Sequence, residues 1–154
     1  MIYKQQAQEI FACYEMKVAY KKRIPKRFKI QKSSDSYEFF KTLFNETTIE
    51  WTESCYILCL NKINGVIGFY KLSEGGTSGV LVDSKVIYSI ALQCGASSVM
   101  VAHNHPSGNL KPSPGDEHVT KQLKEAGKVL DIALLDHLII SSDGYYSFAD
   151  EGKI

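Results

Sequence analysis

The chain has few of the features that mark exported or membrane-bound proteins. No run approaches the roughly 18 consecutive apolar residues that a membrane-spanning helix needs. Residues 1–16 lack the apolar centre of a signal peptide. The four cysteines form no CxxC pair, so we expect them to be reduced and mostly buried. These absences predict a cytoplasmic protein that does not contact a membrane.

Charge of one sign is also scarce, because the net charge of the 154 residues is only +1. The field of the whole molecule therefore predicts no partner. Residues 21–32, KKRIPKRFKIQK, are a local exception, since seven of these twelve are Lys or Arg and none is acidic. Such a run either follows the phosphates of a nucleic acid or forms a solvated sheet edge that resists aggregation. The sequence leaves both interpretations open.

The length fits one domain, and the 44% hydrophobic content is enough for a core. Strands and helices are interspersed along the chain. This order predicts an α/β or α+β fold around a mixed or mostly antiparallel sheet flanked by helices. Gly127 is expected to break the last helix before its apolar stripe ends. The expected strands are 14–20, 54–60, 66–72, 97–102, 132–140 and 145–148, and the expected helices are 34–45, 84–94 and a segment that begins near 114.

The stretch HNHPSGNLKPSPGD, residues 103–116, carries the most chemistry. In extended backbone, residues i and i+2 point to the same side, so His103 and His105 can present their imidazoles to one point. Turn-forming residues follow and can bring Asp116 back toward them. Two imidazoles and one carboxylate leave one tetrahedral position for water. That ligand set is typical of catalytic zinc, whereas structural zinc is usually closed by four protein ligands.

The same residues also fit a purely structural interpretation. Ser113 and Asp116 match the S-x-x-[DE] capping box, and Pro114 stands at the favoured first helical position. On this interpretation Ser113 caps the helix and Asp116 interacts favourably with the helix dipole. The two roles can coexist, because a helix can be capped at the residues that hold a metal.

The H-x-H-P and S-x-x-D segments, with a glutamate upstream, resemble the JAMM (MPN+) metalloprotease motif. The fuller string HNHPSG…PS…D, together with LLDHLII and YYSF, resembles the bacterial RadC-like branch of that family. The resemblance covers residues 33–152. It implies a JAB/MPN domain of cytidine-deaminase-like layering over 33–154, preceded by a strand and basic arm at 1–32. It also implies one Zn²⁺ per chain, held by His103, His105 and Asp116.

The resemblance further implies a hydrolase that cleaves an amide or isopeptide bond. Ser113 would bond the reacting water or the oxyanion, and a glutamate at the start of an early strand would act as general base and acid. Glu53 fits that position, with Glu50 as the nearest rival and Glu74 as a more distant one. Many JAMM proteins have Ser or Thr between the two histidines, where this chain has Asn104.

Two other functions stay open. The family's historical link to DNA repair suggests a nucleic-acid-binding accessory protein that uses the 21–32 run, and a metal-binding scaffold without turnover is the other. We expect His118 to face solvent. Asp136 and His137 lie in an apolar strand, where they either form a hydrogen-bonded pair within the sheet or orient a ligand. The sequence names neither a substrate nor an oligomeric state.

Overall fold

The computed structural model describes residues 28–75 and 82–154. The predicted strand 14–20 and most of the basic run, residues 21–27, lie outside the described residues. Within the described ranges, none of the helices has the length and apolar character needed to cross a membrane.

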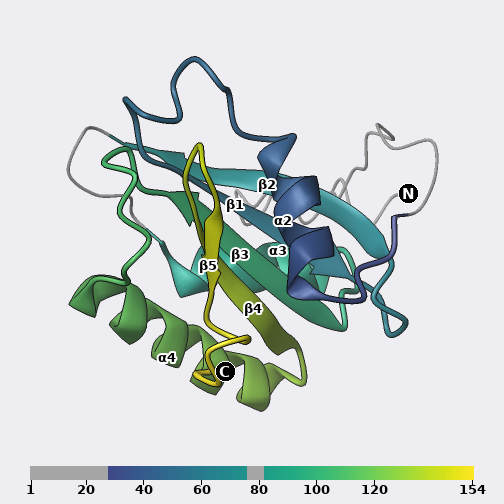
Figure 1. Cartoon of the computed structure of the whole chain (residues 1–154). Helices are drawn as coiled ribbons and strands as arrows, with labels where there is room; N and C mark the ends of the chain where they lie inside the picture. Colours follow the sequence, from purple (N-terminus) through teal and green to yellow (C-terminus); the bar gives the residue numbers. More distant parts are fainter. Residues whose placement is uncertain (1–27, 76–81) are drawn as a thin grey trace, which may run out of the picture.

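Five strands form one sheet in the spatial order β2-β1-β3-β4-β5 (Figure 1). The strands β3 and β4 run parallel, and every other neighbouring pair is antiparallel. The sheet is therefore mixed, as predicted. The strands are β1 (Ser54–Leu60), β2 (Val66–Glu74), β3 (Ser98–Asn104), β4 (Ala133–Ile140) and β5 (Tyr145–Ser147).

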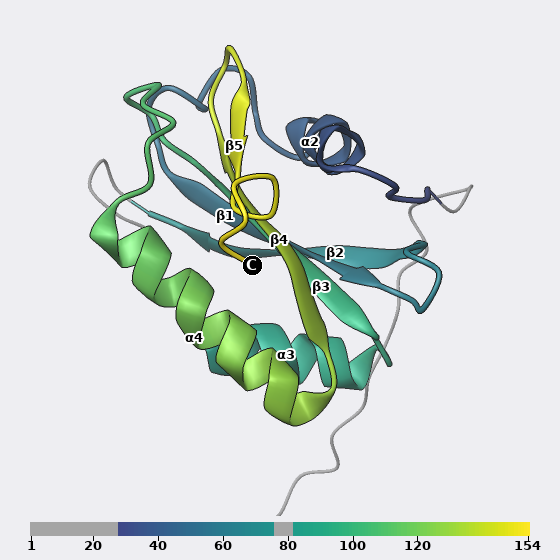
Figure 2. The same ribbon diagram turned by 60° about the horizontal axis from the view of Figure 1, so that its bottom comes forward.

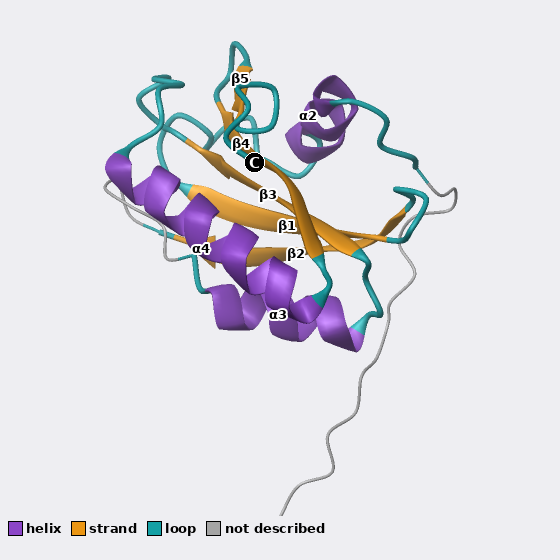
Figure 3. Cartoon of the chain, turned by 90° about the horizontal axis from the view of Figure 1, so that it is seen from below, coloured by secondary structure: helices purple, strands orange, loops and turns teal. Residues whose placement is uncertain are grey.

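Among the described residues, three helices flank this sheet: α2 (Ser33–Lys41), α3 (Ser84–Gln93) and α4 (Pro114–Leu130). The helices α3 and α4 lie on one face and α2 lies on the other (Figures 2 and 3). α4 connects the parallel strands β3 and β4, which cannot be joined by a tight turn. This arrangement confirms the expected α/β class with helices on both sides of a mixed sheet.

Both faces of the central strands are apolar, so consecutive residues of β1 and β3 alternate between two cores. Each core is closed by the helices on its side. The core beneath α3 and α4 includes Cys55, Ile57, Cys59, Ile87, Ala91, Val99, Val101 and Leu123, and the core beneath α2 includes Phe40, Tyr56, Leu58, Leu60, Met100, Ala102 and Leu138.

Capping and turn residues in the sequence mark the observed ends of several helices and strands. A turn at 61–65 joins the antiparallel strands β1 and β2, and the Asn61 side chain accepts hydrogen bonds from two backbone N–H groups of this turn. α3 begins after Asp83, which accepts a hydrogen bond from the N–H of Lys85 at 2.9 Å. It is followed by Gly95 with a φ of 63°. The predicted helix at 34–45 is shorter than expected, because α2 ends at Lys41.

The prediction that Gly127 ends the last helix is wrong, because α4 continues through it to Leu130. Gly127 lies where α4 is in close contact with α3 and with the residue Ile132 before β4. A Cβ atom at this position would lie 2.6 Å from the hydroxyl oxygen of Tyr88 on α3 and 2.4 Å from the carbonyl oxygen of Ile132. The close contact therefore requires glycine, at a cost in helix propensity of about 1 kcal/mol.

Asp136 is a buried carboxylate that ties β4 to the segment around β5. Its Oδ2 accepts a hydrogen bond from the hydroxyl of Ser147 at 2.6 Å. Its Oδ1 accepts from the backbone N–H groups of His137 at 2.8 Å and Ala149 at 3.0 Å. Burial raises the pKa of Asp136, and these hydrogen bonds oppose that rise. The carboxylate thus holds the C-terminal hairpin against the sheet.

We predict that Asp136→Ala lowers the free energy of unfolding by about 2–4 kcal/mol, because buried donors lose their acceptor. Asp143 is exposed in the turn of the same hairpin. Asp143→Ala, as a matched control, should stay within about 0.5 kcal/mol of the unaltered chain. Urea unfolding followed by circular dichroism measures both variants. Equal stability of the two would show that the carboxylate does not hold the hairpin.

Candidate metal centre

Two histidines at the end of β3 point toward α4. His103 continues the alternation of Val99 and Val101, which belong to the core beneath α3 and α4. His105 lies one residue beyond the strand and two residues after His103. The Nε2 atoms of the two rings are 3.0 Å apart. The i, i+2 spacing thus brings both imidazoles to one point, as the sequence predicted.

Asp116 reaches the same point from the first turn of α4. Its Oδ1 lies 3.1 Å from Nε2 of His103, and its Oδ2 lies 3.5 Å from Nε2 of His105. The capping box is also present. Ser113 accepts a hydrogen bond from the N–H of Asp116, and its own N–H and hydroxyl each donate to Oδ2 at 2.7 Å. Ser113 therefore caps the helix and holds the carboxylate in place at once.

Glu53 approaches the histidines from the residue before β1. Its carboxylate and the nitrogens of His103 and His105 form a group whose ligand atoms all lie within 4.8 Å of one another. Glu53 is half-buried. Its two rivals are exposed: Glu50 lies three residues earlier, and Glu74 forms an ion pair with Lys71 at 2.8 Å. Of the three candidate glutamates, Glu53 is therefore the one that lies beside His103 and His105.

Asn104, between the two histidines, fixes the segment that carries Glu53. It points to the opposite face of β3 and is fully buried. Its Oδ1 accepts from the N–H of Ser54 at 2.7 Å, and its Nδ2 donates to the carbonyl oxygens of Ile49 at 2.6 Å and Thr52 at 2.9 Å. Sequence reasoning noted Asn104 as a family feature and missed this role. The alternation of side chains along a strand could have indicated that the Asn104 amide points away from His103 and His105 and needs partners of its own on the opposite face.

The donor atoms fit a single metal ion. Nδ1 of His105 faces the carbonyl oxygen of Asn109 at 2.5 Å. A carbonyl only accepts, so this nitrogen carries hydrogen and the neutral ring keeps a lone pair at Nε2. Two ligands on tetrahedral zinc, each about 2.0–2.1 Å from it, lie about 3.3 Å apart. The three separations between His103, His105 and Asp116 run from 3.0 to 3.5 Å.

The local electrostatics also favour a cation. Burial alone would raise the pKa of Asp116, but hydrogen bonds with His103, His105 and Ser113 outweigh it and hold that pKa well below its usual range. The hydrogen bond with Asp116 raises the pKa of His105. Burial raises the pKa of Glu53, against the attraction of the two imidazoles. A metal ion bound at this point would therefore compete with protons for His105.

The remaining candidates separate clearly. His118 is exposed on α4, as predicted. Asp136 serves the C-terminal hairpin, as described above. His137 is buried, and its Nε2 lies 2.9 Å from Nδ1 of His103. Burial lowers the pKa of His137 well below its usual value, so the ring is neutral. Of Asp136 and His137, His137 is thus the one that contacts His103.

A protein-family model described as the RadC-like JAB domain matches residues 30–153 of this chain. The chain belongs to the RadC-like JAB family. The match spans the whole described sheet, its helices and the cluster of histidines and carboxylates. It confirms the resemblance carried by HNHPSG…PS…D, and the mixed five-stranded sheet agrees with this domain.

The chain is similar to several UPF0758 proteins. It is 42% identical to one from Flavobacterium johnsoniae over 124 aligned residues. This alignment covers 80% of this chain and 53% of that protein. It is 33% identical over 150 residues to one from Chlorobaculum parvum, covering 96% and 65%. One from Thermotoga maritima is 40% identical over 98 residues, covering 64% and 44%. The RadC-like JAB chain thus aligns with only part of each relative's length.

We predict that Asn104→Ala loosens the segment before β1 and lowers the free energy of unfolding by about 2–4 kcal/mol, because three hydrogen bonds are lost in a buried place. The sole tryptophan, Trp51, lies in this segment and reports on it. Its fluorescence anisotropy should fall. Asn104→Asp keeps the acceptor for Ser54 but turns a carboxylate oxygen toward two carbonyls, so it should be at least as harmful. Unchanged Trp51 anisotropy in both variants would contradict the assigned role.

Proposed function

We propose that this RadC-like JAB chain is a zinc-dependent metallopeptidase or isopeptidase. JAB domains are often metallohydrolases. The observation that carries the proposal is the convergence of His103, His105 and Asp116 within 3.0–3.5 Å, with the half-buried carboxylate of Glu53 beside the two histidines. Three protein ligands leave a position for water, and a free carboxylate next to that position supplies an acid and base.

Zinc is the metal that this donor set favours, because two imidazoles and one carboxylate are its usual catalytic ligands. His103, His105 and Asp116 would hold it. A zinc ion bound there would lower the pKa of a bound water to about 7 and so would supply a nucleophile at neutral pH. The hydrogen bonds from Ser113 to Asp116 Oδ2 keep the carboxylate in position and leave its Oδ1 beside His103.

Glu53 would move the proton. Burial moves the pKa of Glu53 upward, toward neutral pH, and a group whose pKa lies near the working pH both accepts and returns a proton efficiently. It would take a proton from the attacking water and deliver it to the leaving amine. The Ser113 hydroxyl would turn from Asp116 to steady the negative oxygen of the tetrahedral intermediate. The outcome is hydrolysis of an amide or isopeptide bond.

A role in DNA binding stays a prediction, because most of the 21–32 run lies outside the described residues. A cytoplasmic location is likewise a prediction. Salt-dependent DNA affinity that falls when Lys21, Lys22 and Arg23 become Glu would support the nucleic-acid interpretation.

We predict that the purified chain holds about one zinc per molecule at neutral pH and that His105→Ala abolishes this binding, because a tetrahedral site that loses one of three protein ligands is too weak. His118→Ala is the matched control and should keep the metal, since this exposed histidine lies outside the cluster. Atomic emission spectrometry gives the stoichiometry. Absence of metal from the unaltered protein, even after zinc is supplied, would refute the proposed function.

We further predict that Glu53→Gln lowers the rate of peptide-bond hydrolysis by at least about 100-fold while the zinc content is unchanged, because proton transfer is lost and the ligands are kept. Glu50→Gln changes a nearby exposed glutamate and should leave the rate unaltered. A mixed-sequence peptide library, together with isopeptide-linked peptides, can be digested and read by mass spectrometry. A zinc-loaded chain that cleaves none of these substrates would favour the scaffold hypothesis.

A further inference from the structure

His137 lies between a proposed metal ligand and helix α4. It is 1% exposed. Its Nε2 lies 2.9 Å from Nδ1 of His103, and its Nδ1 lies 2.7 Å from Oγ1 of Thr120 on α4. The ring of Phe148 stacks on it, with the centroids 5.0 Å apart and the planes at 9°. Both ring nitrogens of His137 therefore have a single defined partner.

A shift in strand register turns His137 toward α4. Val99 pairs with Leu134, but Val101, two residues later, pairs with His137, three residues after Leu134. The irregularity in β4 thus contributes one extra residue. Without it, the residue beside Val101 would be Asp136. The backbone itself therefore places an imidazole on the face of the sheet where His103 points.

Hydrogen bonds link Asp116, Thr120, His137 and His103 in a row, and the hydrogen bond between Thr120 and Asp116 fixes where the hydrogens of the others lie. The hydroxyl of Thr120 donates to the carbonyl oxygen of Asp116 at 2.6 Å, because a carbonyl only accepts. Its one hydrogen is then used, so it accepts from Nδ1–H of His137. A neutral His137 consequently has a lone pair at Nε2, which accepts Nδ1–H of His103. His103 is left with its lone pair at Nε2, beside Asp116 and His105.

We infer that Thr120 and His137 are positioning residues that fix the tautomer and the ring orientation of His103, so that Nε2 always faces the metal position. This inference rests on the proposed metal site. The proposed role differs from general packing because each group in the row donates to the next, from His103 to His137, Thr120 and the Asp116 carbonyl, so only one tautomer of each ring fits. The row of hydrogen bonds starts at the backbone carbonyl of Asp116, which is a second proposed ligand. Asp116 and His103 are therefore coupled through Thr120 and His137. Partners of this kind typically change metal affinity by about 10–100-fold.

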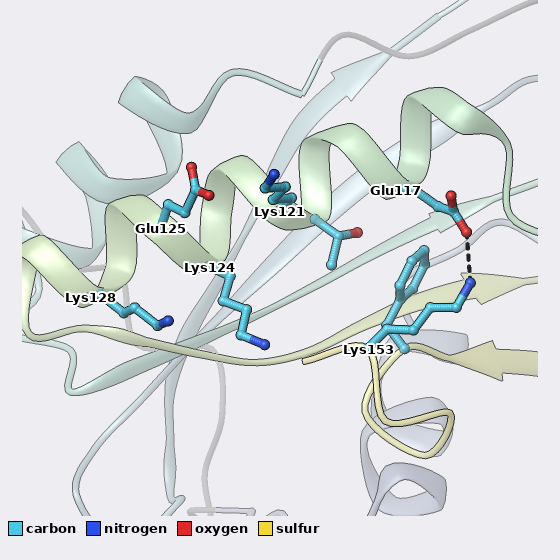
Figure 4. Close-up of a pocket in the computed structure, with 8 residues that line it drawn as sticks. Glu117, Lys121, Lys124, Glu125, Lys128 and Lys153 are labelled. Carbon is cyan, nitrogen blue, oxygen red and sulfur yellow. Dashed lines mark hydrogen bonds and ion pairs between the residues drawn. The ribbon is translucent and has the colours of Figure 1, made fainter.

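The C-terminal residues Phe148 and Lys153 cover one face of the His137 ring, beside Thr120. A pocket of about 460 Å³ lies along α4, and its lining includes Thr120 and Phe148 but none of the ligands (Figure 4). Lys153 reaches over Phe148, 5.7 Å from the ring centroid, to bond Glu117 at 2.7 Å. Thr120 and Phe148 are both almost fully buried despite this pocket. Water is therefore kept from competing for the nitrogens of His137.

The test compares zinc affinities of the full chain by competition with a chromophoric chelator. Thr120→Val removes the hydroxyl at nearly constant shape and should weaken zinc binding about 10-fold or more, whereas Thr120→Ser keeps the hydroxyl and should bind as the unaltered chain does. His137→Phe should weaken zinc binding similarly. His137→Gln retains an acceptor toward His103 and a donor toward Thr120, so it should recover most of the affinity.

A second readout separates tautomer control from simple packing. In ¹⁵N-histidine NMR spectra, His103 of the metal-free and zinc-loaded chain should carry its hydrogen on Nδ1, and Thr120→Val should give a mixture of tautomers in the metal-free form. If His137→Phe fails to fold, the Thr120 pair decides the matter.

The outcomes are distinct. Tight zinc binding by the unaltered chain with equal binding by folded Thr120→Val overturns this inference and leaves the proposed function standing. An unaltered chain that binds no zinc overturns the proposed function and the inference with it.

Discussion

The pleat of β3 is the constraint on which the centre depends. Its alternation sends His103 toward α4 and Asn104, the next residue, to the opposite face. The first side chain lies beside His105 and Asp116, and the second holds the segment that carries Glu53. Because the period of a strand is two, a slip of one residue would exchange these faces. One strand therefore positions both the two histidines and the segment before β1 that carries Glu53.

The two carboxylates of the site are set apart by their surroundings. Asp116 sits among donors that hold its pKa far below normal, whereas burial raises the pKa of Glu53. An anion that stays ionised suits a metal, and a carboxyl nearer neutrality suits proton transfer. The nearly balanced charge of the whole chain concealed this local contrast. The proposed division between metal ligand and acid–base group therefore rests on hydrogen bonds and burial rather than on net charge.

The sequence revealed the parts of the site that depend on near neighbours. His103 and His105 are two residues apart in a strand, and Asp116 opens a helix with recognisable capping residues. Gly127 was misjudged because the close approach of Tyr88 overrides its poor helix propensity. The sequence does not show the partners of Asn104 and Thr120, since these partners lie 50 and 17 residues away in the chain. The register irregularity in β4 leaves no local signal either, because it is defined by pairing with β3.

The order in which the ligands occur along the chain has a consequence for folding. His103 and His105 are sequence neighbours, while Asp116 reaches them only when α4 has packed against the sheet. An unfolded chain therefore still holds two imidazoles within reach of one ion, and any affinity of that state for metal reduces the stability that metal adds to the native state. If the proposed metal site is right, the two histidines could bind an ion before α4 packs, and Asp116 would complete the site afterwards.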